Sequence, residues 1–413
     1  MKLAEQAVKA KQASAQVRVL DNAQKNQVLL EFADLLEADA AGILQANAED
    51  MRAAKAGGMN AAMLDRLRLD EARIRQIAQG VRQVAALADP VHQILEERTL
   101  ASGLRLKKIS VPFGVIAVIY ESRPNVAADC AALCFKAGSA CLLKGGRESA
   151  RSGRAIVRQM QTALEHAGIT ADAVHLADQP SHEEVQQLMC DRAHIDLLIP
   201  RGGSGLIRTV VDHARVPVIE TGAGICHVYV DAGADLKMAL AVTVNAKTSR
   251  PSVCNAMETL LVQESIAAEF IPMAVQAMQE KGVTIYGCSR SRELAPGILP
   301  VTADSYDTEY GCLAMSLKVV AGVDEAIAHI NAHGTHHSDA IISRNENNVQ
   351  KFMALVDSAC VYHNASTRFT DGFEFGLGAE IGISTQKLHA RGPMGLKELT
   401  SYAYQIEGEG QIR

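Results

Sequence analysis

The run from Asn245 to Cys254 holds the side chain best suited to covalent chemistry. Cys254 follows Pro251 closely, and the polar residues around it predict a loop between an apolar helix and an apolar strand. Arg250 and Lys247 come just before it, and positive charge near a thiol lowers its pKa and increases the reactive thiolate. The alternative is a buried thiol that packs as a small hydrophobic group. The flanking residues favour a nucleophile.

Two further polar motifs follow predicted strands. Asn125 comes after the apolar run Val115 to Tyr120, and its side-chain amide is suited either to an oxyanion or to capping a helix. Lys144 and Arg147 end the strand expected over 140–144. Cations at such a strand end accommodate the extra phosphate of NADP, whereas an acidic residue takes the ribose hydroxyls of NAD. The alternative for both cations is an exposed position in solvent.

A glycine-rich turn, Pro200-Arg-Gly-Gly-Ser-Gly205, joins a predicted strand to a predicted helix. Glycine lets the backbone approach a ligand closely, and a helix N-terminus attracts phosphate. An ordinary tight turn is the alternative interpretation. The chain contains neither G-x-G-x-x-G nor a Walker A motif, which argues against ATP as a substrate.

Other reactive side chains have simpler explanations. The histidines of His333-Gly-Thr-His-His337 lack a matching cysteine or carboxylate cluster, so the sequence predicts no metal site. Cys226 and His227 form a rival nucleophile and base, but adjacent residues on a strand point to opposite faces. Cys130 and Cys134 lie four residues apart on an apolar helix and are expected in the core.

Length and composition bound the fold and the class of function. The chain has 413 residues, enough for two or more domains, and its 48% hydrophobic and 21% charged residues are typical of a globular protein. A net charge of −6 argues against a nucleic-acid partner. Nine scattered cysteines and no apolar run of about 18 residues indicate reduced thiols, no membrane span and a cytoplasmic location.

The pattern of elements predicts an α/β fold with two doubly wound domains and a small oligomerisation ribbon. Helical periodicity dominates residues 2–88, and strands then alternate with helices from Val111 to Ile219 and again from Ala239 to Tyr362. Within the ribbon we expect Leu104, Leu106 and Ile109 to be exposed on an isolated monomer. The predicted domains are 1–225 for the cofactor, with 95–111 and 400–413 as the ribbon, 226–365 for catalysis, and 366–399 returning to the cofactor domain and active-site rim.

Taken together, these stretches resemble the aldehyde dehydrogenase superfamily, and within it the branch that reduces L-glutamyl 5-phosphate in proline biosynthesis. The resemblance covers nearly the whole chain. It implies that Cys254 is the nucleophile, that Asn125 supplies the oxyanion-hole amide and that Lys144 contacts the cofactor. It places the cofactor loop at Gly202, Ser204 and Gly205, and Glu309 at the nicotinamide ribose. The motifs that carry it are Ile119–Asn125, Leu198–Gly205, Asn245–Cys254, Asn364–Gly372 and Ser384–Gly395.

The resemblance also implies a reaction, in which NADPH reduces an acyl phosphate through a cysteine thioester. Arg123, Arg250 and Arg368 are candidates for binding the substrate, although each is also suited to a structural ion pair. Glu220 stands where hydrolytic members of the superfamily keep a general base, and we leave it out of the essential set. A hydrolysing NAD(P)-dependent aldehyde dehydrogenase and a catalytically silent phosphate-binding protein are the alternatives.

The expected partners follow from the same resemblance. We expect a homodimer or a dimer-based homo-oligomer built through the ribbon, because an isolated two-stranded ribbon is marginal in water. We also expect functional coupling to the glutamate 5-kinase that supplies the acyl phosphate, and no nucleic-acid or membrane partner.

Overall fold

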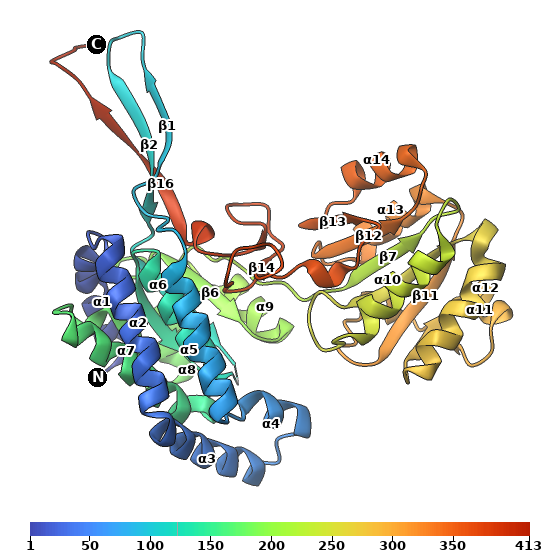
Figure 1. Ribbon diagram of the computed structural model, residues 1–413, viewed down its shortest axis with the longest axis horizontal. Coiled ribbons are helices and arrows are strands. Elements are labelled where there is room, and N and C mark those ends of the chain that lie inside the picture. The colour runs from blue at the N-terminus through green and yellow to red at the C-terminus, as the bar shows by residue number, and fades with distance from the viewer. Residues whose placement is uncertain (122) are drawn as a thin grey trace. The chain divides into compact units, whose positions relative to one another are not determined.

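The computed structural model describes residues 1–121 and 123–413, apart from the side chains of Ala61, Ala62 and Ser204 (Figure 1). The chain forms two compact units, each built on a parallel sheet, which confirms the predicted α/β fold with two doubly wound domains. The first unit comprises Met1–Glu220, Gly376–Gly382 and Met394–Arg413, and the second comprises Thr221–Phe375 and Ile383–Pro393.

The first unit opens with helices, as the periodicity predicts, and continues with a four-stranded parallel sheet in the order β5-β4-β3-β6. A capping box begins the helix that starts at Asn22, because the Asp21 carboxylate accepts the N–H of Gln24 at 2.8 Å. The opening helices are α1 (Leu3–Val17), α2 (Asn22–Ala38), α3 (Ala40–Ala56), α4 (Ala61–Leu67) and α5 (Glu71–Ala86). The sheet and its helices are β3 (Val115–Tyr120), α6 (Pro124–Lys136), β4 (Ala140–Lys144), α7 (Ala150–His166), β5 (Val174–Leu176), α8 (His182–Cys190), β6 (Leu197–Arg201) and α9 (Ser204–His213).

Burial accounts for the apolar residues of β3 and of the segment Val216 to Ile219. Every residue of β3 is buried, as its unbroken apolar run requires for a strand covered on both faces. The segment Val216 to Ile219, at the end of the first alternating set, is shorter than a full strand and lies beside β6 through one parallel bridge, between Val218 and Leu198. Val216 and Ile219 are buried.

A separate antiparallel sheet of three strands belongs to the first unit and extends beyond its helices (Figure 1). It consists of β1 (Ile94–Thr99), β2 (Arg105–Pro112) and β16 (Thr400–Glu407), with β2 in the middle. The expectation that Leu106 and Ile109 are exposed is wrong, because they lie on the central strand and are buried. The exposed large apolar side chains are on the two flanking strands instead: Ile94 and Leu95 on β1, and Tyr402, Tyr404 and Ile406 on β16.

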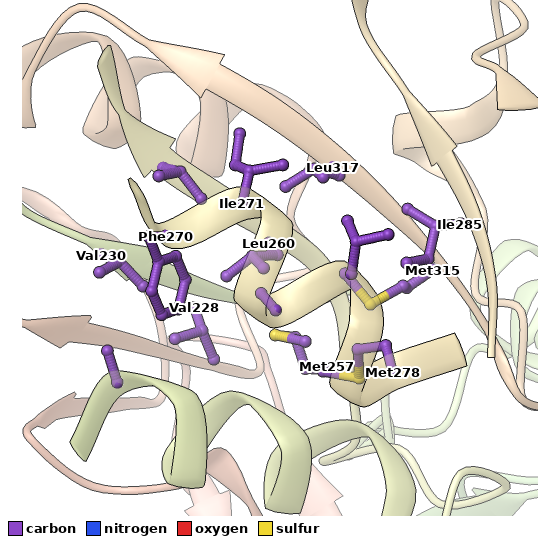
Figure 2. Packing of buried hydrophobic residues seen from close by; sticks show 14 of the residues in the cluster. Val228, Val230, Met257, Leu260, Phe270, Ile271, Met278, Ile285, Met315 and Leu317 are labelled. Atoms are coloured by element: carbon purple, nitrogen blue, oxygen red, sulfur yellow. The ribbon is translucent and has the colours of Figure 1, made fainter. Parts of the chain in front are cut away.

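The second unit is a seven-stranded parallel sheet in the order β10-β9-β11-β8-β7-β12-β13. Its core lies where α11 packs on β8, with Phe270 and Ile271 against Leu260 (Figure 2). The strands are β7 (Cys226–Val230), β8 (Met257–Gln263), β9 (Thr284–Gly287), β10 (Leu299–Pro300), β11 (Ala314–Val320), β12 (Ser338–Ile342) and β13 (Cys360–His363). The helices are α10 (Leu236–Thr248), α11 (Glu264–Glu280), α12 (Ser289–Leu294), α13 (Val323–His333) and α14 (Glu346–Leu355).

Two further expectations concern membrane-spanning helices and disulfide bonds. Among the helices of the described residues, none combines the length and apolar character that a membrane span requires. None of the nine cysteines forms a disulfide in the part of the chain that the structure describes, as expected for reduced thiols.

A buried lysine joins the opening helices to α6. The Lys136 ammonium donates to the Asn22 side chain at 2.6 Å and to the carbonyl oxygen of Ala85 at 3.0 Å. Burial lowers the pKa of Lys136 to about 8, although the carboxylate of Asp89 opposes this shift. The folded chain therefore releases this proton at a lower pH than the unfolded chain does.

We predict that this lysine makes stability rise with pH. Between about pH 8 and 10.5 the unfolded state holds the Lys136 proton and the folded state does not, so the free energy of unfolding increases with pH. Lys136→Met should remove an increase on the order of 1–3 kcal/mol from this range. Urea unfolding followed by circular dichroism measures the slope, with the surface variant Lys9→Met as control. Equal slopes in wild type and Lys136→Met would contradict the assignment.

Candidate active site

Cys254 lies half-buried on the turn between α10 and β8, as predicted. Its carbonyl oxygen accepts the thiol of Cys226 at 3.2 Å. The backbone of Gly224 presses against the same carbonyl, since a Cβ atom on Gly224 would lie 1.5 Å from the Cys254 oxygen. Only glycine fits at position 224 with this turn in place. Gly224 and Cys226 therefore both pack against the backbone carbonyl of the candidate nucleophile.

The role expected for Lys247 has to be corrected. Its ammonium is fully buried and lies 2.6 Å from the carboxylate of Glu258, which is also fully buried. The positive charge of Lys247 is therefore compensated by Glu258 on β8, so it does not act on the Cys254 thiol as an unpaired cation. Burial raises the pKa of Glu258 to about 7, and Lys247 opposes that rise. The pair joins the last turn of α10 to β8, the two elements that the Cys254 turn connects.

Arg368 is a cation near the Cys254 thiol, which is the role that the sequence suggested for Lys247. Burial and the nearby charge of Arg250 lower the pKa of Arg368, while the Cys254 thiolate acts in the opposite direction. The Arg368 guanidinium donates to the side chains of Ser249 and Asn255, both on the Cys254 turn. The second unit thus brings two of the three predicted arginines to the candidate nucleophile.

Asn255 fixes the segment that carries Arg368. Its side-chain amide donates to the backbone carbonyl oxygen of Thr370 at 2.8 Å. Its backbone carbonyl oxygen accepts the hydroxyl of Thr367 at 2.7 Å. Asn255 is buried, so these bonds are shielded from competing water. Sequence reasoning missed this residue, although it directly follows Cys254.

Glu309 is connected to the same turn through Gly224. Its carboxylate accepts the Gly224 N–H at 2.9 Å, and the nearby N–H of Gly311 donates to Glu258 at 3.2 Å. The buried Lys247–Glu258 pair therefore also holds the loop that presents Glu309. Glu309 itself is exposed.

In the first unit, Asn125 and Arg123 lie at the start of α6. Arg123 is the residue before the first turn, and Pro124 occupies the first helical position, where a missing N–H costs nothing. The Asn125 side chain is half-buried and its amide donates to the carboxylate of Asp129 at 3.0 Å. An amide nitrogen carries two hydrogens, so one remains to meet an oxyanion.

A cavity of about 180 Å³ opens at the ends of β3 and β4, between α8 and α9. The two helices contribute apolar side chains, and the strand end contributes Lys144 and Gly145. A Cβ atom on Gly145 would lie 2.9 Å from the Tyr120 side chain, so the backbone here has no room for a larger residue. The residues of α8 and α9 that line it are His182, Val185, Met189, Leu206, Thr209 and Val210.

These residues fit one end of a dinucleotide. The cavity is smaller than a typical site for a whole ligand, about 300–1,000 Å³, and it combines an apolar slot for a flat base with a cation at its edge. Lys144 is half-buried, and burial lowers its pKa, with Arg147 acting in the same direction. An anionic group beside Lys144 would favour its charged form.

The glycine-rich turn is contacted by an acidic residue from outside it, Glu121, which the sequence interpretation did not use. The carboxylate of Glu121, which directly follows β3, accepts the N–H of Gly203 at 2.9 Å. A Cβ atom on Gly202 would lie 2.6 Å from that carboxylate, whereas Gly205 has open space around it. The backbone of Ser204 begins α9, and its side chain lies outside the described residues.

The remaining candidates have structural partners. His333 contacts Asp307 at 2.8 Å, and His336 contacts the carbonyl oxygen of Asp357. Within the described ranges, no group of three or more histidine, cysteine or acidic residues is arranged to hold a metal. His227 pairs with Asp339 at 3.0 Å, whereas Cys226 contacts the Cys254 carbonyl, so the two neighbours do face different partners.

The predicted site residues thus form two groups. Arg123, Asn125, Lys144 and the residues of the glycine-rich turn belong to the first unit, at the carboxyl ends of its strands. Cys254, Arg250, Arg368 and Glu309 belong to the second unit. Glu220 is the last residue of the first unit's main segment and is half-buried.

The chain is similar to known proteins over its whole length. Residues 2–287 match the model of the aldehyde dehydrogenase family. A gamma-glutamyl phosphate reductase of Carboxydothermus hydrogenoformans is 52% identical over 407 residues, covering 98% of each chain. The crystal structure of a gamma-glutamyl phosphate reductase from Thermotoga maritima is 43% identical, with a TM-score of 0.98 over 100% of both chains.

A more distant structure shares the fold alone. An engineered glycolyl-CoA reductase with bound NADP+ is 15% identical, with a TM-score of 0.69 over 98% of this chain and 96% of that one. The family match and the relatives over the full length settle the classification. The chain belongs to the aldehyde dehydrogenase family, whose members are oxidoreductases that use a nicotinamide cofactor, and within it to the gamma-glutamyl phosphate reductases.

Proposed function

We propose that this protein reduces L-glutamyl 5-phosphate to L-glutamate 5-semialdehyde and phosphate with NADPH, the second step of proline biosynthesis from glutamate. The observation that carries the proposal is the Cys254 turn, which combines a half-buried thiol with Arg250 and Arg368. The gamma-glutamyl phosphate reductases that match the whole chain support this substrate.

The chain's own residues supply the acyl transfer. The Cys254 thiolate attacks the acyl carbon of the substrate, while the Asn125 amide and the Cys254 backbone N–H stabilise the developing oxyanion. The phosphate leaves with help from positive charge, for which Arg123, Arg250 and Arg368 are the candidates. The product of this half-reaction is a thioester on Cys254.

The second half-reaction needs a hydride. Lys144 would hold a nicotinamide cofactor at one of its phosphates and Glu309 would hold it at its ribose; the chemistry the cofactor would supply is hydride transfer to the thioester carbon. The Asn125 amide again holds the oxygen of the tetrahedral thiohemiacetal. Collapse of this thiohemiacetal expels the Cys254 thiolate and releases the aldehyde. No water takes part, so the Glu220 carboxylate is not required as a base.

Phosphate dependence separates this function from that of a hydrolysing aldehyde dehydrogenase. In the reverse direction, wild type should reduce NADP with glutamate 5-semialdehyde only when phosphate is present, because phosphate must cleave the thioester. Cys254→Ala should lose more than about 10²-fold of this rate, since the covalent nucleophile is gone, and should still bind the cofactor. Fluorescence of bound NADPH checks binding. NADP reduction without phosphate would indicate hydrolysis, and activity retained in Cys254→Ala would indicate Cys226 as nucleophile.

Lys144 provides a test of the cofactor's identity. Lys144→Ala should raise the KM for NADPH by about 10- to 150-fold and leave the KM for NADH nearly unchanged, because one charge-assisted hydrogen bond to the extra phosphate contributes about 1.5–3 kcal/mol. Arg147→Ala is the matched comparison, since Arg147 is exposed at the same strand end. Equal increases for NADPH and NADH in Lys144→Ala would remove this lysine from the extra phosphate.

We also propose that the protein is a homodimer built through the antiparallel sheet. Tyr402, Tyr404 and Ile406 alternate on one face of β16 and are all more than half exposed, an apolar stripe that a partner would cover. Functional coupling to the kinase that supplies the acyl phosphate and a cytoplasmic location remain predictions.

Light scattering tests the assembly. Wild type should be dimeric or a multiple of dimers at micromolar concentration, and Ile406→Asp should dissociate because a charge enters the covered face. Ile412→Asp is the control, since Ile412 is exposed but lies beyond β16. A monomeric wild type would refute the proposal, and an undisturbed Ile406→Asp oligomer would place the interface elsewhere.

A further inference from the structure

Asp129 is a carboxylate in an apolar setting that the proposed mechanism does not use. It is the only acidic residue of α6, whose other residues around it are mainly alanine, cysteine, leucine and valine. The side chain is half-buried, and its carboxylate accepts a hydrogen bond from the Asn125 amide at 3.0 Å. Sequence reasoning missed it, although an isolated acid four residues after Asn125 is visible in the printed sequence.

The charge of Asp129 is poorly compensated. It makes no ion pair with any residue in the described ranges, and Arg201 influences it only from longer range. Burial raises the pKa of Asp129 to about 6 in spite of the hydrogen bond from Asn125. A carboxylate held away from water with a neutral amide as its partner is costly, unless a cation joins it. Such a site is suited to an ammonium group supplied by a ligand.

The spacing of Asn125 and Asp129 matches the substrate. The Asn125 amide nitrogen and the Asp129 carboxylate share one helix face and lie 3.0 Å apart. Two ligand atoms, each about 3 Å from one of these groups, are therefore separated by up to about 9 Å. In a glutamyl group, three carbon–carbon bonds separate the acyl carbon from the carbon that carries the α-ammonium, a span of roughly 4–5 Å at about 1.5 Å per bond. With the acyl oxygen at Asn125, the ammonium therefore falls within hydrogen-bond reach of Asp129.

We propose that Asp129 binds the α-ammonium group of the substrate and so selects an amino-acid acyl phosphate over the corresponding group without an amine. This inference rests on the proposed function, because it requires the acyl oxygen at Asn125. The competing interpretation is that Asp129 only orients the Asn125 amide, which would make it a positioning residue with no preference for the amine.

Two aldehydes distinguish these roles in the phosphate-dependent reverse reaction with NADP: glutamate 5-semialdehyde and 5-oxopentanoate, which lacks the amine. Asp129→Asn keeps the shape and a hydrogen-bond acceptor but removes the charge. We expect kcat/KM for the amino aldehyde to fall on the order of 10²-fold and kcat/KM for 5-oxopentanoate to change by less than about 3-fold. Asp129→Glu should recover part of the preference, and Asn125→Ala should slow both aldehydes equally.

Asp34→Asn is the matched control, because it removes the same charge from an exposed side chain of the first unit and should leave both values unchanged. Equal losses for the two aldehydes in folded Asp129→Asn would overturn the proposal in favour of orientation of Asn125, and no loss would remove Asp129 from the site. A wild type that fails to reduce NADP with phosphate and glutamate 5-semialdehyde would instead refute the proposed function, so the two failures are distinguishable.

Discussion

The buried ion pair of Lys247 and Glu258 is the contact on which the geometry around Cys254 depends. It joins the end of α10 to β8, and the turn that carries the thiol is the segment between them. The Gly311 N–H also donates to Glu258, and Glu309 accepts the N–H of Gly224. Because charges taken out of water tolerate few arrangements, such a pair contributes more to a unique geometry than to stability.

A second constraint comes from the direction of the strands. In a parallel sheet the carboxyl ends of all strands lie at one edge, so Glu121, Lys144 and Arg201 end at the same edge of the first unit. Of the neighbouring glycines, Gly205 has open space around it. The predicted site residues are therefore divided between the Cys254 turn in one unit and this sheet edge in the other.

The sequence was sufficient where local physics determines the outcome. A continuous apolar run such as Val115 to Tyr120 is stable only when both faces are covered, and Pro251 with its polar neighbours excludes a helix through Cys254. Both features were predicted correctly. The motifs that indicated the family also contain residues that the structure places at strand ends and on the Cys254 turn.

The sequence was insufficient where a distant partner decides the outcome. Lys247 reads as a cation for the thiol because Glu258 is eleven residues away on the next strand, and only the fold shows that they meet. Leu106 reads as exposed because β16, which covers one side of β2, is contributed by the far end of the chain. The glycine requirement at 224 likewise follows from the Cys254 carbonyl, which sequence patterns do not locate.

In the proposed reaction, catalysis passes through an acyl group on Cys254. Mass spectrometry of the intact protein, mixed with glutamyl phosphate in the absence of reduced cofactor, tests this step most directly. One added glutamyl group is expected, mapped by peptide digestion to Cys254 and removed by hydroxylamine, which cleaves thioesters. A glutamyl group attached to another residue, or full turnover upon cofactor addition with no acyl-protein detectable in rapid-quench samples, would contradict it.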